Sequence, residues 1–224
     1  FILEPLHPIR HCTPFSIAAH TMYEQPDPYE IYEPEGMANL HDAKFEQIDK
    51  RSVRVSGSKF IPAKIKTIKI EGSKKIGYRT FCIAGVRDPI MINRIEEVKS
   101  VVVNEVKQTF DSIISPDDYK VIFRVYGKNA VLGDIEFVKE PAHELGVIVE
   151  AVAKTQDLAD SIGAIARSSI LHCNFEGRKT TSGNVAFPYS PADIQGGEAY
   201  EFSIYHLLET DDPLKLFPIK IKEV

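Results

Sequence analysis

The segment from Leu171 to Tyr189 holds the densest run of residues that suit an anion. Within it, residues 177–184 contain two glycines, two cations and three hydroxyl side chains. Backbone amides freed by glycine, together with arginine and hydroxyl donors, suit a carboxylate or phosphate group. The GxxxxGK[ST] spacing of a Walker A loop is absent. We therefore predict a substrate-binding loop for a carboxylate, and the candidate residues are Arg178, Thr180, Thr181, Ser182, Gly183 and Asn184. The alternative is a polar loop whose hydroxyls satisfy its own backbone.

A second cluster of reactive side chains lies near the start of the chain. We predict that Arg10 contacts substrate and that His11 and His20 transfer a proton. Two alternatives remain: Cys12 as a nucleophile beside one of these histidines, and histidines that only hold a loop together. The His7-x-x-x-His11 spacing can place two imidazoles on one helical face. No HExxH motif and no suitably spaced acidic residue accompany it, so we predict no metal site.

The third candidate segment is Tyr200 to His206. Tyr200 and Phe202 alternate with Glu201 and Ser203, which is typical of a β-strand. Glu201 is our third candidate for proton transfer, with His206 as an alternative. A plain strand without a catalytic group is the other interpretation.

Composition limits the class of protein that carries these residues. The chain has 224 residues, 43% apolar and 26% charged, an ordinary balance for a folded domain. Its net charge of −5 argues against nucleic acid as a partner. No apolar run approaches the roughly 20 residues that span a bilayer, so we predict no membrane partner. Three widely spaced cysteines favour the reducing cytoplasm. The first residues break at Glu4-Pro5 without a basic leader, so we expect no signal peptide.

Periodicity indicates the elements that must position these residues. Prolines interrupt residues 1–41, apart from a short helix expected over 15–24 with Ser16 as its N-cap. Period-two patterns then predict antiparallel strands at 53–56, at 65–70 and at 78–86, separated by turns at glycines. We expect a first domain over 1–76, made of this Pro/His-rich segment and its strands, and a second over 77–224.

The second domain is predicted to follow the order β-α-β-β-α-β. Asp88-Pro89 begins a helix expected to run to about Ile114, because an aspartate N-cap precedes a proline. Strands follow at 119–126 and at 145–153, and the second is apolar enough to lie centrally in a sheet. Thr155 caps a helix to about Leu171, and the last strand is expected at 199–206. The fold class is α+β, with antiparallel or mixed sheets: a ferredoxin-like (split βαβ) unit preceded by a β-rich segment.

Five segments together resemble the acyclic terpene utilisation (AtuA) family. They are HPIRHCTPFSIAAHTMYE (7–24), RVSGSKF (54–60), GYRTFCIAGVRDP (77–89), GRKTTSGNVAFPYSPAD (177–193) and YEFSIYHLLE (200–209). The similarity is greatest to the longer relatives of organic-acid and acyl-CoA catabolic operons, and it covers their C-terminal half. The resemblance implies that an N-terminal half precedes Phe1 or is a separate subunit, and that a small partner protein and an oligomer are to be expected.

The resemblance also implies a function. By analogy, it points to a component of a catabolic enzyme that performs a hydro-lyase, isomerase or related lyase step on a small carboxylic acid or its CoA ester. No cofactor is predicted, and a CoA ester would be the substrate. The alternative is a non-catalytic oligomerisation or assembly domain of a larger complex. The anion-binding residues of 177–184 are independent support for the carboxylate.

Overall fold

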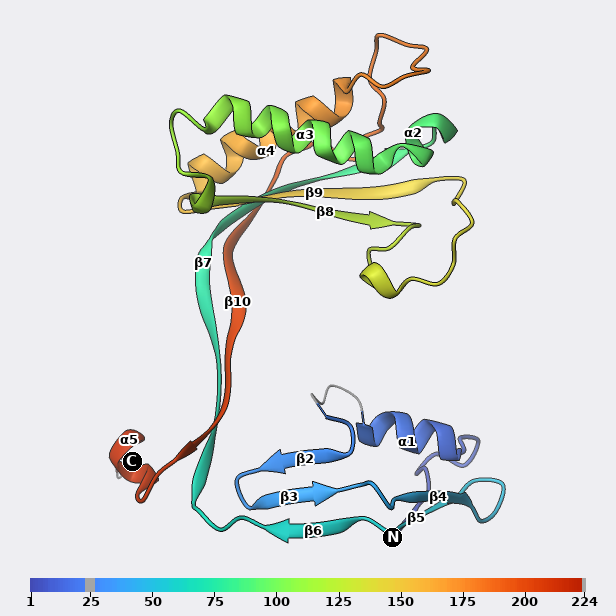
Figure 1. Cartoon of the computed structure of the whole chain (residues 1–224), viewed down its shortest axis with the longest axis vertical. Helices are drawn as coiled ribbons and strands as arrows, with labels where there is room; N and C mark the ends of the chain where they lie inside the picture. Colours follow the sequence, from blue (N-terminus) through green and yellow to red (C-terminus); the bar gives the residue numbers. More distant parts are fainter. Residues whose placement is uncertain (23–26, 223–224) are drawn as a thin grey trace. The chain divides into compact units, whose positions relative to one another are not determined.

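The computed structural model describes residues 1–22 and 27–222, and the chain forms two compact units (Figure 1). Unit 1 comprises Phe1–Gly72 and Ser203–Val224, and unit 2 comprises Ser73–Phe202. Two long strands, β7 (Thr67–Val86) and β10 (Ile194–Glu209), each contribute to both units. We expected a domain boundary after residue 76, with all later residues in the second domain. That boundary stays a prediction.

Unit 2 has the ferredoxin-like plan that the sequence predicts. Its sheet has the order β10-β7-β9-β8, where β8 is Tyr119–Tyr126 and β9 is Leu145–Ala153. Both β7 and β8 pair antiparallel with β9, so the apolar strand is central, as expected. Helices α3 (Ile95–Phe110) and α4 (Gln156–His172) connect the strands and cover one face of the sheet (Figure 1). The α+β fold class is confirmed.

The core of unit 2 lies between the sheet and these two helices. Alternate residues of β7 and β9 point into it, because successive side chains of a strand face opposite sides. The matching stripes occur at helical spacing on α3 and α4. The large side chains of α3 and α4 that are fully buried are Ile95, Val98, Val102, Val106, Ile162 and Ile170.

The helix expected from 88 to about 114 is two helices, so that prediction is wrong in its extent. Asp88 does cap α2 (Pro89–Asn93), accepting hydrogen bonds from the Ile90 and Met91 amides. Arg94 then leaves the helical conformation with φ −104° and ψ 16°, and its amide bonds to the carbonyls of both Ile90 and Met91. The chain turns at this residue, and α3 starts after it. The short helices η1 (Pro116–Asp118) and η2 (Gly133–Ile135) follow later.

The three strands expected at 53–56, 65–70 and 78–86 do not form one meander. The second and third are one continuous strand, β7, so the turns expected at Gly72-Ser73 and Gly77 are wrong. Gly77 keeps the strand extended with φ +141°, and a β-carbon there would lie 2.2 Å from the Ala153 carbonyl oxygen. Only a residue without a side chain lets β7 and β9 pair this closely. The last strand, expected over 199–206, is the longer β10.

Unit 1 contains two three-stranded antiparallel sheets. One has the order β1 (Ile2–Leu3), β5 (Val53–Ser56), β4 (Lys44–Gln47), and the other β2 (Glu30–Glu33), β3 (Gly36–Asn39), β6 (Lys59–Pro62). Helix α1 is Pro14–Met22, and α5 is Pro213–Leu216. Residues 23–24 of the helix expected over 15–24 lie outside the described residues.

The start of α1 differs from the expectation. Thr13, rather than Ser16, precedes the first helical residue. The Ser16 amide donates to Thr13 Oγ1 over 3.1 Å, and the Thr13 amide donates to Ser16 Oγ over 2.9 Å. This reciprocal arrangement is that of a capping box, with serine in the place of the usual glutamate.

Candidate functional site

The predicted anion-binding loop of 177–184 is held together by its own side chains. Arg178 donates from Nη1 to the carbonyl of His172, at the end of α4, and from Nη2 to the carbonyl of Ser182, each over 2.9 Å. The Thr180 and Ser182 hydroxyls lie 2.6 Å apart, and Thr180 Oγ1 also accepts from the Ser182 amide. These contacts match the polar loop that we weighed as the alternative.

The end of this loop packs back on α4. Asn184 donates from Nδ2 to the Cys173 carbonyl over 2.7 Å. A β-carbon at Gly183 would lie 2.3 Å from the Leu171 Cδ1, so this glycine permits close packing. Thr181 is exposed. The structure thus brings the predicted loop residues together, and binding of a carboxylate there stays a prediction.

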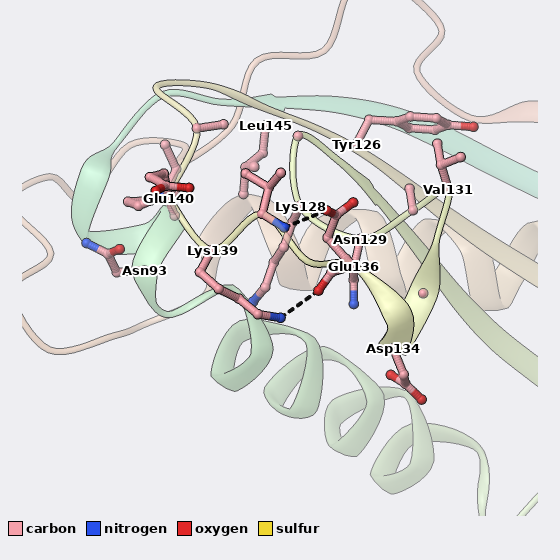
Figure 2. A pocket seen from close by; sticks show the side chains of 17 residues that line it. Asn93, Tyr126, Lys128, Asn129, Val131, Asp134, Glu136, Lys139, Glu140 and Leu145 are labelled. Carbon is pink, nitrogen blue, oxygen red and sulfur yellow. Dashed lines mark hydrogen bonds between the residues drawn. The ribbon is translucent and has the colours of Figure 1, made fainter.

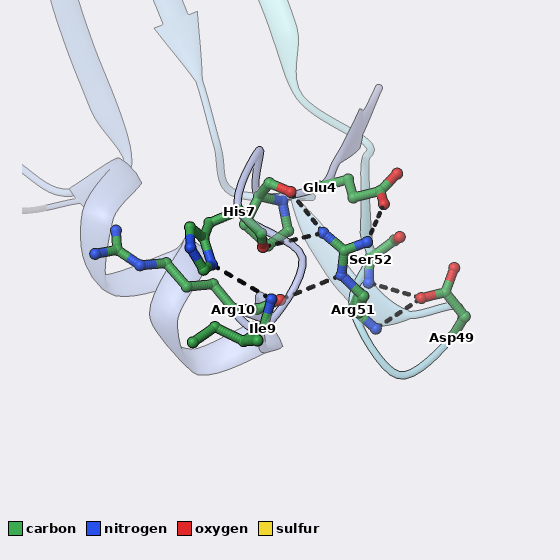
Figure 3. Close-up of polar contacts among 8 residues, drawn as sticks. Glu4, His7, Ile9, Arg10, Asp49, Arg51 and Ser52 are labelled. Atoms are coloured by element: carbon green, nitrogen blue, oxygen red, sulfur yellow. Dashed lines mark hydrogen bonds and ion pairs between the residues drawn. The ribbon is translucent and has the colours of Figure 1, made fainter.

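In unit 1, Arg51 organises the segment that carries Arg10 and His11 (Figure 3). Its guanidinium donates to the carbonyls of Pro5 and Arg10, over 2.7 and 3.2 Å, and Nη1 lies 3.0 Å from a Glu4 carboxylate oxygen. Gln47 adds a 3.0 Å bond to the Cys12 carbonyl. Nothing in the sequence indicated Arg51 and Gln47. Their side chains contact main-chain carbonyls, and every residue has a carbonyl, so residue types do not reveal such contacts.

The predicted proton-transfer residues occupy both units. His11 is exposed. His20 lies on α1 and interacts with another residue of the chain. Both belong to unit 1 together with Arg10, whereas Glu201 belongs to unit 2. Glu201 is exposed, and its Oε2 lies 3.9 Å from the Lys120 Nζ. Their catalytic roles stay predictions.

Unit 2 holds a cavity of ≈ 640 Å³ that sequence reasoning missed (Figure 2). The loop of residues 127–144, between β8 and β9, forms most of its wall, and α2 supplies Ile92 and Asn93. Its size falls in the range of ligand pockets. The cavity mixes apolar side chains with two lysines, two asparagines and three acidic residues. The polar and charged lining residues are Asn93, Lys128, Asn129, Asp134, Glu136, Lys139 and Glu140.

The lysines of the cavity are positioned by neighbouring oxygen atoms. Lys128 Nζ lies 3.0 Å from a carboxylate oxygen of Glu96 on α3. Lys139 Nζ donates to the Glu136 carbonyl over 2.6 Å, and the Glu136 carboxylate accepts from the Val138 amide over 2.8 Å (Figure 2). Since an ammonium group has three donors, each lysine keeps donors for a bound anion.

A polar network also lies between β7 and α4. Asp160 accepts hydrogen bonds from Thr80, from Gln156 over 2.8 Å and from Gln195 over 2.6 Å. Burial raises the pKa of the Asp160 carboxyl, but these three donors lower it by more, so the pKa lies below its usual 3.8. Thr80 is buried, and the network joins the helix to two strands. These hydrogen bonds therefore hold α4 against β7 and β10, which is a structural role.

Metal ligands and apolar helices give no further candidate among the described residues. Over 1–22 and 27–222, no group of three or more histidine, cysteine or acidic side chains could hold a metal ion. Among the helices of the same residues, none combines the length and apolar character needed to cross a membrane.

The fold and cavity define a class of protein: an α+β protein with a ferredoxin-like sheet and a ligand-sized cavity beside its β8–β9 connection. The chain belongs to the acyclic terpene utilisation family, AtuA, whose family model matches residues 10–191. No curated protein and no solved structure matches the chain. The match covers most of the N-terminal segment, the ferredoxin-like unit as far as the residues before β10, and the 177–184 loop, so the family resemblance in the sequence is confirmed.

Proposed function

We propose that this chain is a component of a catabolic enzyme that acts on a small carboxylic acid or its CoA ester, in a hydro-lyase, isomerase or related lyase step. The observation that carries the proposal is the ≈ 640 Å³ cavity of unit 2, whose lining combines Lys128 and Lys139 with a partly apolar wall. Membership of the AtuA family supports it.

The lysines supply the affinity for a carboxylate or thioester carbonyl. Charge-assisted hydrogen bonds from an ammonium are about twice as strong as neutral ones. Asn93 and Asn129 offer further amide donors to the same ligand. Because Lys128 and Lys139 already contact protein oxygens, they are held in place before the ligand arrives. This pre-organisation lowers the entropic cost of binding.

The apolar part of the wall suits an acyl group. It is formed by aliphatic side chains from α2, from the 127–144 loop and from the start of β9. The family name refers to acyclic terpenes, which are branched and apolar, and a branched acyl chain fits such a wall. The aliphatic lining residues are Ile92, Ala130, Val131, Val138, Ala142 and Leu145.

Acidic side chains at the same cavity would move the proton. Lyase and isomerase steps need a base or acid near the reacting carbon, and Asp134, Glu136 and Glu140 line the cavity. We keep His11, His20 and Glu201 as proposed catalytic residues and the 177–184 loop as a proposed second carboxylate contact. In this proposal the N-terminal half or a separate subunit, with a small partner protein, completes the active site.

Deuterium exchange tests the function whichever of these reactions takes place. The full chain, with any subunit that co-purifies, would be incubated in D₂O with short branched carboxylic acids and their CoA esters. We expect deuterium to enter the ligand at carbon, detected by mass spectrometry.

Matched variants test the cavity itself: Lys139→Met in the cavity and Lys107→Met on the surface of α3. Lys139→Met should weaken ligand binding about tenfold, the loss of one charge-assisted hydrogen bond, and Lys107→Met should not. Equal binding by both variants would remove the cavity from the proposal.

One observation favours the alternative, an oligomerisation or assembly domain. The C-terminal segment of unit 1 exposes five large apolar side chains, each more than half accessible: Leu214, Leu216, Phe217, Ile219 and Ile221. Exposed apolar clusters mark interaction sites. Light scattering on the chain with and without residues 211–224 separates the two functions. Loss of an oligomer with unchanged ligand binding would assign assembly to this segment and leave the cavity as the ligand site.

A further inference from the structure

A cluster of charged side chains lies on the sheet face of unit 2 that α3 and α4 leave uncovered. In the strand register Phe81, Glu150 and Ile122 are directly opposite one another. Arg79 is two residues from Phe81 along β7, and Arg124 is two residues from Ile122 along β8. Since residues two apart share one face of a strand, both arginines are diagonal neighbours of Glu150.

The contacts confirm this placement. Arg79 Nε lies 3.2 Å from one carboxylate oxygen of Glu150, and Arg124 Nη1 donates to the other. Only 5% of the Glu150 side chain is accessible, against 36% for Arg79 and 43% for Arg124. The carboxylate is therefore enclosed, while both guanidinium groups still reach solvent.

The Arg79–Glu150–Arg124 cluster carries more positive than negative charge, and it has more N–H donors than its one carboxylate can accept. Two guanidinium groups share one carboxylate, which leaves a net positive charge. Within the described residues, Glu150 is the acidic side chain that contacts both guanidinium groups, although each guanidinium has five N–H donors. The Arg79 Nε is buried without a properly directed acceptor. Lys120 lies on the same face, across Val152 from Arg79, and its charge is balanced by the Glu201 carboxylate 3.9 Å away.

Gly196 on β10 gives the Arg79 side chain its position. A β-carbon at Gly196 would lie 2.4 Å from Arg79 Cγ and 3.4 Å from Phe81 Cε1. The aliphatic stem of Arg79 thus lies against β10 at a point where no side chain intervenes. The half-buried side chains of Ile83, Ile122 and Ile148 share this face. Such apolar neighbours strengthen a hydrogen bond to an anion, because they lower the local dielectric.

We propose that this sheet face is an oxyanion-binding site, in which Arg79 and Arg124 hold a carboxylate or phosphate group and Phe81, Ile122 and Ile148 contact an apolar part of the same molecule. Glu150 orients the two guanidinium groups and does not contact the ligand. The site consists of residues outside the cavity and the 177–184 loop, so it stands independently of the proposed function.

NMR spectra of the full ¹⁵N-labelled chain test the proposal through the arginine Nε–H signals. The probes are inorganic phosphate, 3-methylbutanoate and the neutral 3-methylbutanamide, at constant ionic strength set with sodium chloride. We expect the Arg79 and Arg124 signals to shift in a saturable way with an anion and not with the amide. Saturation by phosphate alone assigns a phosphate ester, by 3-methylbutanoate alone a carboxylic acid, and by both a general oxyanion site. Each of these results supports the proposal.

Variants then separate a ligand site from an ion-pair network that serves only the fold. Arg124→Gln should lower the affinity about tenfold, and Gly196→Ala should lower it by displacing the Arg79 stem. Arg87→Gln is the matched control, since Arg87 is exposed just beyond β7. Equal affinity in Arg124→Gln and Arg87→Gln would overturn the proposal, as would the absence of saturable arginine shifts in the unmodified chain. The unmodified chain decides the question if a variant does not fold.

Discussion

The Nη1 atom of Arg178 donates a 2.9 Å hydrogen bond to the carbonyl oxygen of His172, the last residue of α4. The last carbonyls of a helix have no partner within it, so this arginine satisfies one of them. Its Nη2 donates to the Ser182 carbonyl at the other side of the loop. One side chain therefore closes the 177–184 loop onto the helix end.

Replacing Arg178 with alanine should lower the free energy of unfolding by about 1–2 kcal/mol, because two carbonyls lose a charged donor. Urea denaturation measures this loss. Lys179→Ala, on the next, exposed residue, should stay within about 0.5 kcal/mol of the unmodified chain. Unchanged stability of Arg178→Ala, with a loss of carboxylate binding, would instead favour the anion-binding role predicted from the sequence.

Two glycines with positive φ should respond differently to alanine. At Gly77 the new β-carbon would meet the Ala153 carbonyl oxygen at 2.2 Å, whereas at Gly133, with φ +59°, no atom lies within 4 Å. Gly133→Ala should cost about 1 kcal/mol from backbone strain alone. Gly77→Ala should cost about 3 kcal/mol, since the β7–β9 pairing must also shift. Thermal unfolding compares the two, and a larger loss at Gly133 would contradict this account.

The three cysteines should differ in reactivity at pH 8. Burial, with the Asp193 carboxylate as a smaller cause, raises the pKa of the Cys82 thiol to about 11, and burial also raises the pKa of Cys173. The reactive form of a thiol is the thiolate. Iodoacetamide should therefore modify Cys12, which is partly exposed, well before the other two. Peptide mass mapping before and after unfolding checks the order; early labelling of Cys82 would show that its strand opens.

Acid should weaken the anchor between β7 and α4. The pKa of Asp160 is lower in the folded chain than its usual 3.8. A carboxyl with a lowered pKa stabilises the fold above that usual value, and this contribution is lost as the pH falls through the folded pKa. Asp160→Asn should thus be less stable at pH 7 and should lose less stability between pH 4 and pH 2. Urea denaturation across this range compares it with Asp157→Asn on the same helix, which should keep the full acid response.

Some elements were predictable because their signal is local. Apolar residues repeat at helical spacing from Ile95 to Ile113; the five from Ile95 to Phe110 are buried on α3, whereas Ile113, beyond the end of the helix, is exposed. The near-continuous apolar run of 145–153 indicated a central strand, and β9 does lie between β7 and β8. Asp88 and Thr155 accept hydrogen bonds from helical amides, as their capping positions require.

Other features depend on partners that are distant in the sequence. A glycine between two period-two segments predicts a turn at Gly77, but the Ala153 carbonyl decides that it extends a strand. The residue types of 177–184 predict a ligand contact for Arg178, which stays a prediction, and only the structure shows that two of its nitrogens donate to the carbonyls of His172 and Ser182. Lys128 and Lys139 gave no signal, because a cavity arises only when the 127–144 loop folds against α2.

The sequence by itself thus determined the α+β class, the order of the ferredoxin-like elements, the main buried stripes and the family. Periodicity and caps depend on residues within a few positions of one another, so they can be read along the chain. The tertiary structure alone decided the continuity of β7, the cavity and the Arg79–Glu150–Arg124 cluster. Each of these depends on strand register and on contacts between residues far apart in the chain, and register is set only when the whole sheet assembles.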